Sequence, residues 1–221
     1  MLPISFAQDS NICQTHTKAD GYNIDDSARN LILDIHNQKR QATAKAQYRN
    51  GRNNFNIRHA KNMMEMEYSC QMEEDAHLIA SKCNRQETPR TSLVNGENFY
   101  KIDKSFELIG SPTNVAYTAG TAWFEEITKN GINRNLDFTK FLANKKPALY
   151  HWTQMVWAET YKIGCDIGDC GDYTILVCRY SPKGNVISKK VYQPGKKLAC
   201  TLGESQSYAT LCNHPQEEEQ L

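Results

Sequence analysis

Eight cysteines, spread over the whole 221-residue chain, constrain its fold more than any other feature. None belongs to a paired CxxC array, which argues against a zinc ribbon or a redox motif. An even set without such arrays favours disulfide bonds, so we expect a secreted, extracellular protein. The cysteines are Cys13, Cys70, Cys83, Cys165, Cys170, Cys178, Cys200 and Cys212.

Length and charge narrow the class of protein further. A chain of 221 residues suits one sizeable domain. A charged fraction of 23% and a net charge of +1 give no global preference for nucleic acid. No apolar run approaches the ~20 residues of a membrane span. The opening "MLPISFAQDS" is too short and too uncharged for a complete signal peptide, so the expectation of secretion rests on the cysteines.

Three segments have the apolar spacing of amphipathic helices. The first begins near Ser27, behind a polar "DDS" entry that can cap it. The second lies in "EYSCQMEEDAHLIASKC", where Met72, Ala76, Ile79 and Cys83 share one face. The third, "NVAYTAGTAWFEEITKNG", ends at a glycine, which is a typical stop signal.

The C-terminal part reads as a β-hairpin followed by a short extension. "YKIGCDIGDCGDYTILVCRYSPKGNV" contains two β-type runs joined by a Gly/Asp-rich turn, so Cys165 and Cys178 could bridge the two arms. After Tyr192 the chain is poor in apolar residues and holds two cysteines, which predicts an extension stapled by Cys200 and Cys212 before an acidic end. The pairing of the other four cysteines stays open.

Four motifs in order carry a family resemblance: "HNQKR" (36–40), "NGENFY" (95–100), "HWTQMVW" (151–157) and "CRYSPKGNV" (178–186). They resemble the signature motifs of the CAP superfamily, which comprises cysteine-rich secretory, antigen 5 and pathogenesis-related 1 proteins. The cysteine pattern, the "AKNMMEMEYSC" run and the two-cysteine tail resemble venom allergen-like, activation-associated secreted proteins of parasitic worms. We therefore expect an N-terminal extension (1–20), a CAP domain (21–192) and a two-cysteine extension with an acidic tail (193–221).

The resemblance implies an α+β fold, a three-layer α/β/α sandwich with a disulfide-stapled C-terminal extension. Helices would cover both faces of a largely antiparallel sheet. Such a scaffold leaves a cleft on one side.

In many family members that cleft holds two histidines and two glutamates that can bind a divalent metal. The resemblance carries over to His151, Glu97 and Glu126, while Glu87 stands where the other histidine is usual. Fewer imidazole ligands disfavour zinc, so we expect no required cofactor and at most a weakly bound divalent metal. The alternative is that the two glutamates only hold helix ends and the His151 segment by hydrogen bonds. No GxSxG, HExxH or triad motif is present, so the expectation is no enzyme.

Several family members bind small lipids, sterols at an aromatic-bearing loop and fatty acids between two helices. The segment before His151 offers an apolar loop for a sterol or fatty acid. The alternative is a loop folded onto the core. The candidate lipid-binding residues are Leu136, Phe138, Phe141, Leu142 and Tyr150.

A basic run without any acid extends from Lys39 to Met64. It would suit an anionic surface such as a sulfated glycan or an acidic lipid, or it is an ordinary solvated helix end and loop. Its cations are Lys39, Arg40, Lys45, Arg49, Arg52, Arg58 and Lys61.

Taken together, these features predict a secreted, non-catalytic CAP-domain protein that binds sterols or related lipids, with a use in host modulation. The alternative is a secreted ligand for a host immune or cell-surface receptor that needs no lipid. A metal-dependent hydrolase is a distant third. Nucleic acid is not an expected partner.

Overall fold

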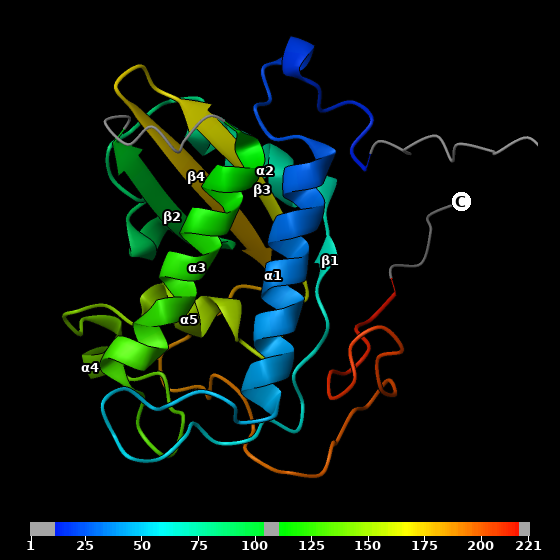
Figure 1. The fold of residues 1–221 in the computed structure, drawn as a ribbon, viewed down its shortest axis with the longest axis vertical. Helices are drawn as coiled ribbons and strands as arrows, with labels where there is room; N and C mark the ends of the chain where they lie inside the picture. The colour runs from blue at the N-terminus through cyan, green and yellow to red at the C-terminus, as the bar shows by residue number, and fades with distance from the viewer. Residues whose placement is uncertain (1–11, 104–110, 217–221) are drawn as a thin grey trace, which may run out of the picture.

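The computed structural model describes residues 12–103 and 111–216. One four-stranded sheet lies at the centre, in the order β1-β3-β4-β2 (Figure 1). β3 (Lys162–Asp169) and β4 (Tyr173–Ser181) form an antiparallel hairpin, and β2 (Gly96–Asp103) pairs antiparallel with β4. The short β1 (Glu67–Tyr68) runs parallel to β3. The predicted hairpin is thus the centre of a largely antiparallel sheet.

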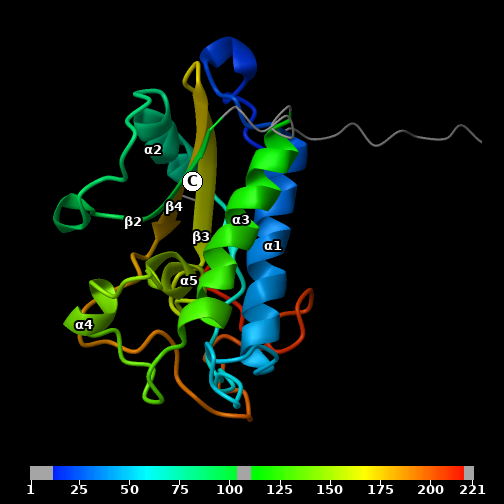
Figure 2. The ribbon, with the colours of Figure 1, turned by 60° about the vertical axis from the view of Figure 1, so that its left-hand side comes forward.

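Helices cover both faces of this sheet, as Figure 2 shows. α2 (Cys70–Ala80) packs on β3 and β4 from one side, while α1 (Asp26–Ala44) and α3 (Pro112–Asn130) pack against each other on the opposite side. The predicted three-layer α/β/α arrangement is confirmed. No helix in the described part of the chain is long and apolar enough to cross a membrane.

Four short elements complete the fold. α4 (Lys140–Ala143) and α5 (Tyr150–Met155) lie between α3 and β3 in the chain. Two 3-10 turns, η1 (Lys18–Asp20) and η2 (Arg90–Ser92), precede α1 and β2. Because α5 contains the motif histidine, that residue sits on a helix rather than on a loop.

The helix boundaries follow from capping and spacing. The Asp25 side chain accepts a hydrogen bond from Ala28 N at 2.8 Å, which satisfies a free amide at the start of α1. α3 starts behind Ser111 with a proline in its first turn and ends at Gly131, as the sequence predicts.

The second helix is shorter than its apolar spacing predicts. α2 ends at Ala80, and Cys83 lies beyond it with φ of 50° in the left-handed region. The expectation that Cys83 continues the helix is wrong, because this residue leaves the helical path to reach Cys170 in the turn between β3 and β4.

Four disulfides join all eight cysteines. The predicted Cys165–Cys178 and Cys200–Cys212 bridges are both present. The pairs that the sequence left open are Cys13–Cys70 and Cys83–Cys170.

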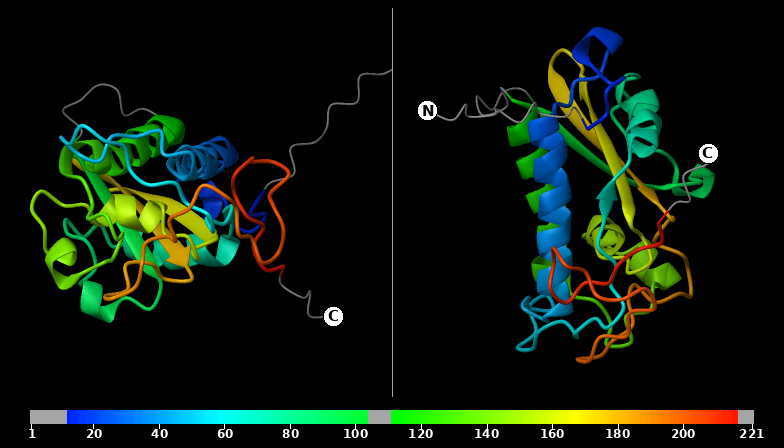
Figure 3. Two further views of the ribbon diagram at one scale, coloured as in Figure 1. Left: turned by 90° about the horizontal axis from the view of Figure 1, so that it is seen from below. Right: turned by 90° about the vertical axis from the view of Figure 1, so that its right-hand side faces the viewer.

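Both extensions are tied to the domain. Cys13 attaches the N-terminal segment to the start of α2. The C-terminal extension runs along the domain in Figure 3. Within it Leu211 is fully buried, and Cys212 N donates to Met63 O at 2.8 Å. The opening decapeptide and the acidic residues 217–221 lie outside the described residues.

Candidate functional site

His151 lies on α5 at the wall of an open cleft of about 520 Å³, which we call the His151 cleft. α5 turns its other side chains inward, and Trp152 is fully buried. The cleft combines the loop after α2 with the middle of β2. Its lining residues are Arg85, Gln86, Glu87, Phe99, Tyr100, Lys101 and His151.

Glu126 of α3 fixes the orientation of His151. One carboxylate oxygen lies 2.7 Å from His151 Nδ1, and the other accepts the backbone amides of His151 and Trp152, each at 3.0 Å. A carboxylate only accepts, so Nδ1 carries a hydrogen, and in the neutral imidazole Nε2 keeps a lone pair. Trp123 stacks near the imidazole with ring centroids 6.1 Å apart. Within the described residues His151 Nε2 is buried and has no hydrogen-bond partner.

Glu97 on β2 is likewise engaged. Its two oxygens accept Thr88 N at 2.9 Å and Thr88 Oγ1 at 2.8 Å, and Arg179 Nη1 lies 3.0 Å from Oε2. The carboxylate is 3% exposed, so these partners offset the cost of burying its charge. Glu97 therefore anchors the loop after α2 to the sheet.

These residues do not fit a tightly held zinc ion as they are arranged. The carboxylate oxygens of Glu97 and Glu126 already accept hydrogen bonds from other groups. Only His151 Nε2 and the half-exposed Glu87 of this set remain available as metal ligands. Zinc in proteins usually takes three or four protein ligands. The one cluster of at least three ligand atoms found within the described residues is Cys13, His16 and Glu73, where Cys13 is already in a disulfide.

Two residues of the "HNQKR" motif are scaffold. His36 is fully buried, with Nδ1 2.7 Å from Ile32 O and Nε2 2.9 Å from the Tyr180 hydroxyl, and burial lowers its pKa to about 4. Arg40 is also fully buried, and it has backbone carbonyls in place of a carboxylate partner. Its guanidinium donates to the carbonyls of Met64, Met155, Trp157, Ala158 and Thr160.

Four of the five candidate lipid-binding residues belong to the core. Leu136, Phe138, Leu142 and Tyr150 are each 6% exposed or less, whereas Phe141 on α4 is 78% exposed. The expected loop is thus mostly folded onto the core. Two of its residues, Phe138 and Tyr150, still form part of a pocket wall.

That pocket, which we call the apolar pocket, has a volume of about 390 Å³ and lies between η2, α4, α5 and the segment after β4. Its floor carries the buried side chain of Asn185, whose amide donates to Tyr150 O at 2.9 Å. Arg90 stacks over the Tyr150 ring at 3.7 Å, and burial raises the pKa of that tyrosine. The remaining lining residues are Thr91, Phe138, Ala143, Lys183, Val186 and Ile187.

Sequence reasoning missed the polar residues of this wall, among them Asn185, Lys183 and Arg90. Asn185 and Lys183 lie in the recognised "CRYSPKGNV" motif, but a motif alone does not tell which of its side chains line a cavity. Nothing in the sequence marks Arg90 as a pocket residue, because an arginine in a polar loop is typical of any protein surface.

An α/β/α sandwich with four ordered motifs and a carboxylate-oriented histidine on α5 defines a CAP domain. Residues 33–180 match the model of the cysteine-rich secretory protein family, CAP, and the chain belongs to this family.

Two relatives show which members of the family this chain is similar to. The chain is 32% identical over 197 residues to Ancylostoma secreted protein of Ancylostoma caninum, covering 86% of this chain but 45% of that protein. It is 30% identical to Scoloptoxin SSD976 of Scolopendra dehaani, with 86% of each chain covered. The chain thus spans about half of the first relative and most of the second.

Solved structures agree. The crystal structure of NaASP2 with Zn²⁺ superposes with a TM-score of 0.77 at 30% identity, over 86% of this chain and 97% of that one. BmVAL-1 superposes with a TM-score of 0.78 at 28% identity, over 89% and 98%. The resemblance to secreted and venom allergen-like proteins is confirmed, and the zinc belongs to the NaASP2 structure.

Proposed function

We propose that this protein is a secreted, non-catalytic carrier that binds a sterol or a related lipid in the apolar pocket. The observation that carries the proposal is the pocket itself, an apolar cavity with a polar floor. Its volume lies in the range of small-molecule sites, which usually combine apolar walls with few polar groups. Secretion is supported by the four disulfides and by the secreted relatives.

The polar groups favour a hydroxyl over a carboxylate. Asn185 Oδ1 is buried next to the Tyr150 phenol and accepts no hydrogen bond of good geometry from the described residues. A ligand hydroxyl can donate to it. The two cations are already engaged, since Arg90 donates to Ala143 O and Lys183 donates to Leu93 O, each at 2.5 Å. Each cation keeps further N–H donors with which a fatty-acid carboxylate can pair, so the acceptor Asn185 Oδ1 is the group that favours a hydroxyl.

The test is equilibrium binding of radiolabelled cholesterol to the purified, oxidised protein, with palmitate in a parallel arm. Ile187→Arg places a charge at the rim of the pocket, where Ile187 is 39% exposed, so the fold tolerates it. We expect the cholesterol Kd to rise at least tenfold. Phe141→Ala is the matched control, because Phe141 is exposed on α4 and lines a neighbouring pocket instead.

Other outcomes are equally informative. No saturable binding of cholesterol by the folded protein would refute the sterol proposal. Loss of binding in Phe141→Ala with retention in Ile187→Arg would move the site to the outer face of α4. Binding of palmitate alone would replace the sterol with a fatty acid.

A protein partner without lipid is the second candidate. The chain is 28% identical to hookworm platelet inhibitor 1 of Ancylostoma caninum and covers 81% of it. That name assigns the relative an action on cells of another organism. If neither lipid binds, saturable binding of the labelled protein to intact platelets or leukocytes is the measurement that supports this alternative.

Catalysis is not part of the proposal. A hydrolase needs a nucleophile or an activated water beside an oriented base. His151 is oriented by Glu126, yet its Nε2 has no hydroxyl or thiol partner among the described residues. Esterase activity of the wild type that is lost in a folded His151→Ala variant would support a hydrolase instead.

A further inference from the structure

Cations from three distant segments gather at the end of the molecule opposite η1. The loop 49–61 follows α1, the segment 131–137 follows α3, and the segment 189–199 follows β4. The three lie together at the lower end in Figure 1 and in the right panel of Figure 3. The sequence run alone had suggested only the first of them.

Hydrogen bonds between the segments confirm that they are neighbours. Arg58 Nη1 lies 3.3 Å from Arg134 O, which joins the first segment to the second. The third runs beside the first, because Gly195 N donates to His59 O at 2.9 Å and Ala199 N donates to Lys61 O at 2.7 Å. The Tyr192 hydroxyl donates to Arg58 O at 2.9 Å.

The charge of this region is one-sided. The three segments hold nine Lys or Arg residues and one acid, Asp137, in a chain whose net charge is +1. Asp137 is already paired with Lys190 at 2.7 Å. We call six exposed cations of the region the basic face; they are Arg49, Arg52, Arg58, Arg134, Lys196 and Lys197. No salt bridge to a described carboxylate neutralises any of the six.

The surface differs from the basic run in the sequence. Arg40 is buried and belongs to the scaffold, and Lys39 lies over the Phe124 ring at 4.9 Å. These two cations of the run therefore do not contribute to the face, and neither do Lys45, which lies outside the three segments, and the less exposed Lys61. Arg134, Lys196 and Lys197 replace them from elsewhere in the chain.

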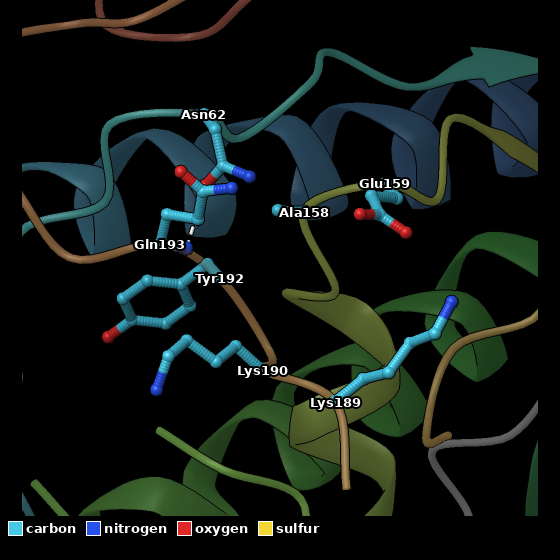
Figure 4. Close-up of a pocket in the computed structure, with 7 residues that line it drawn as sticks. All are labelled: Asn62, Ala158, Glu159, Lys189, Lys190, Tyr192 and Gln193. Carbon is cyan, nitrogen blue, oxygen red and sulfur yellow. Dashed lines mark hydrogen bonds between the residues drawn. The ribbon is translucent and has the colours of Figure 1, made fainter. Parts of the chain in front are cut away.

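A small cavity of about 240 Å³ borders the basic face (Figure 4). Lys189 and Lys190 stand on one side of it, and Asn62 holds Gln193 N at 2.8 Å on the other. Glu159 is the acid at its edge.

We propose that the basic face binds a sulfated glycosaminoglycan. Unpaired arginines suit tetrahedral oxyanions, because the guanidinium donates two parallel hydrogen bonds. The four disulfides fit an extracellular protein, where such glycans are the abundant polyanions. The face lies outside the lining of the apolar pocket, so this function does not depend on lipid binding.

The other polyanions fit less well. Single-stranded nucleic acid is bound by several stacking aromatics, and the three segments expose one large apolar side chain, Phe55, whose ring faces Arg134 at 5.8 Å. Peripheral membrane binding usually adds an inserted apolar face to the cations. Phe55 alone does not provide one.

The test is the salt concentration that elutes the full-length, oxidised protein from heparin, compared with a sulfonate cation exchanger of equal capacity. Arg52→Gln/Arg134→Gln/Lys197→Gln removes one exposed cation from each segment without touching the core. Polyanion binding releases roughly 0.7 to 0.9 counterions per contact, so we expect the slope of log Kd against log salt to fall by about 2. Lys18→Gln/Lys82→Gln/Lys101→Gln removes the same charge elsewhere and should leave heparin binding unchanged within twofold.

Three results would overturn the proposal. One is elution from heparin at no higher salt than from the exchanger. Another is an equal loss of heparin binding in both triple variants, which would indicate a response to net charge alone. The third is tighter, face-dependent binding to phosphatidylserine vesicles or to a single-stranded oligonucleotide than to heparin. Heparin binding that needs the face and is lost on chemical desulfation of the heparin would support it.

Discussion

At the scale of single residues, Glu87 decides what the His151 cleft can bind. It lines the same cleft as His151, whose Nε2 is free, and its side chain is 41% exposed. An imidazole there would place two histidines in the wall of one cleft, which is a better start for a zinc site than one histidine and one carboxylate. We predict that Glu87→His lowers the Kd for Zn²⁺ roughly tenfold or more.

Isothermal titration with Zn²⁺ near neutral pH measures this change. Gln86→His is the matched control, because Gln86 also lines the cleft but not at the position of the missing histidine. Adding His151→Ala to Glu87→His should abolish the gain. An equal gain from both single histidine variants would mean that zinc binds loosely to any new imidazole, and would contradict the pairing with His151.

The second residue-scale prediction concerns Arg40. Its guanidinium is buried and donates to five backbone carbonyls, so it holds the chain around Met64 against the segment after α5. Arg40→Met keeps the apolar stem but leaves these carbonyls without their donor. We expect a loss of about 3 kcal/mol or more in the free energy of unfolding, measured by urea denaturation. Arg52→Met, at an exposed site, should change it by about 0.5 kcal/mol or less; equal effects would show that Arg40 is not a structural cation.

At the scale of secondary-structure elements, the His36–Tyr180 hydrogen bond joins α1 to β4 and makes stability depend on pH. Burial lowers the pKa of His36 to about 4, below the ordinary 6.5 of an unfolded histidine. Between these values the unfolded chain binds the extra proton, so stability falls as the pH drops through 6.5 and levels off below 4. The contribution from this group between pH 7 and pH 5 is about 2 kcal/mol.

Urea unfolding of the wild type and of His36→Gln at both pH values isolates that contribution. The variant lacks the titrating group, so its stability should fall by about 2 kcal/mol less than that of the wild type over this range. His59→Gln serves as the control, since His59 is half-buried in the loop after α1 and its Nδ1 lies 3.2 Å from Ala44 O at the end of the same helix, not from a strand residue. Parallel pH profiles of wild type and His36→Gln would refute the assignment.

The elements also show where sequence reasoning succeeds and where it stops. Helical spacing and capping residues predicted α1 and α3 well, because both signals are local. The contact of α2 with β3 was beyond prediction: a Cβ on Gly164 would lie 2.2 Å from Glu73 N, so the glycine permits a close approach that only the packed layers reveal. The partial burial of the expected lipid loop depends in the same way on contacts between distant segments.

At the scale of the whole molecule, long-range contacts formed the sites that the sequence could not assemble. The sequence identified His151, Glu97 and Glu126 and offered hydrogen bonding to the His151 segment as one role for the glutamates, but it did not tell that Glu126 has this role while Glu97 holds Thr88. The apolar pocket and the basic face each combine three or more segments that are far apart in the chain. Such sites are fixed by the topology and not by any local pattern.

The contribution of each disulfide to stability also depends on how far apart its two cysteines lie in the chain. Cys83–Cys170 spans a sequence separation of 87, whereas Cys200–Cys212 spans 12. In the chain-entropy model a cross-link destabilises the unfolded state more as its loop lengthens, and the two loops differ by about 2 kcal/mol. We predict that Cys83→Ser/Cys170→Ser lowers the free energy of unfolding by about 2 kcal/mol more than Cys200→Ser/Cys212→Ser.

Urea denaturation of both double variants under non-reducing conditions measures the difference. Native contacts of the short loop are the competing source of stability. Leu211 and Cys212 are buried against the domain, and Cys212 N donates to Met63 O. If the C-terminal variant loses as much stability as the other, these contacts and not loop entropy set the value of that bridge. In that case its urea m-value should fall too, because the detached extension would already be exposed before global unfolding.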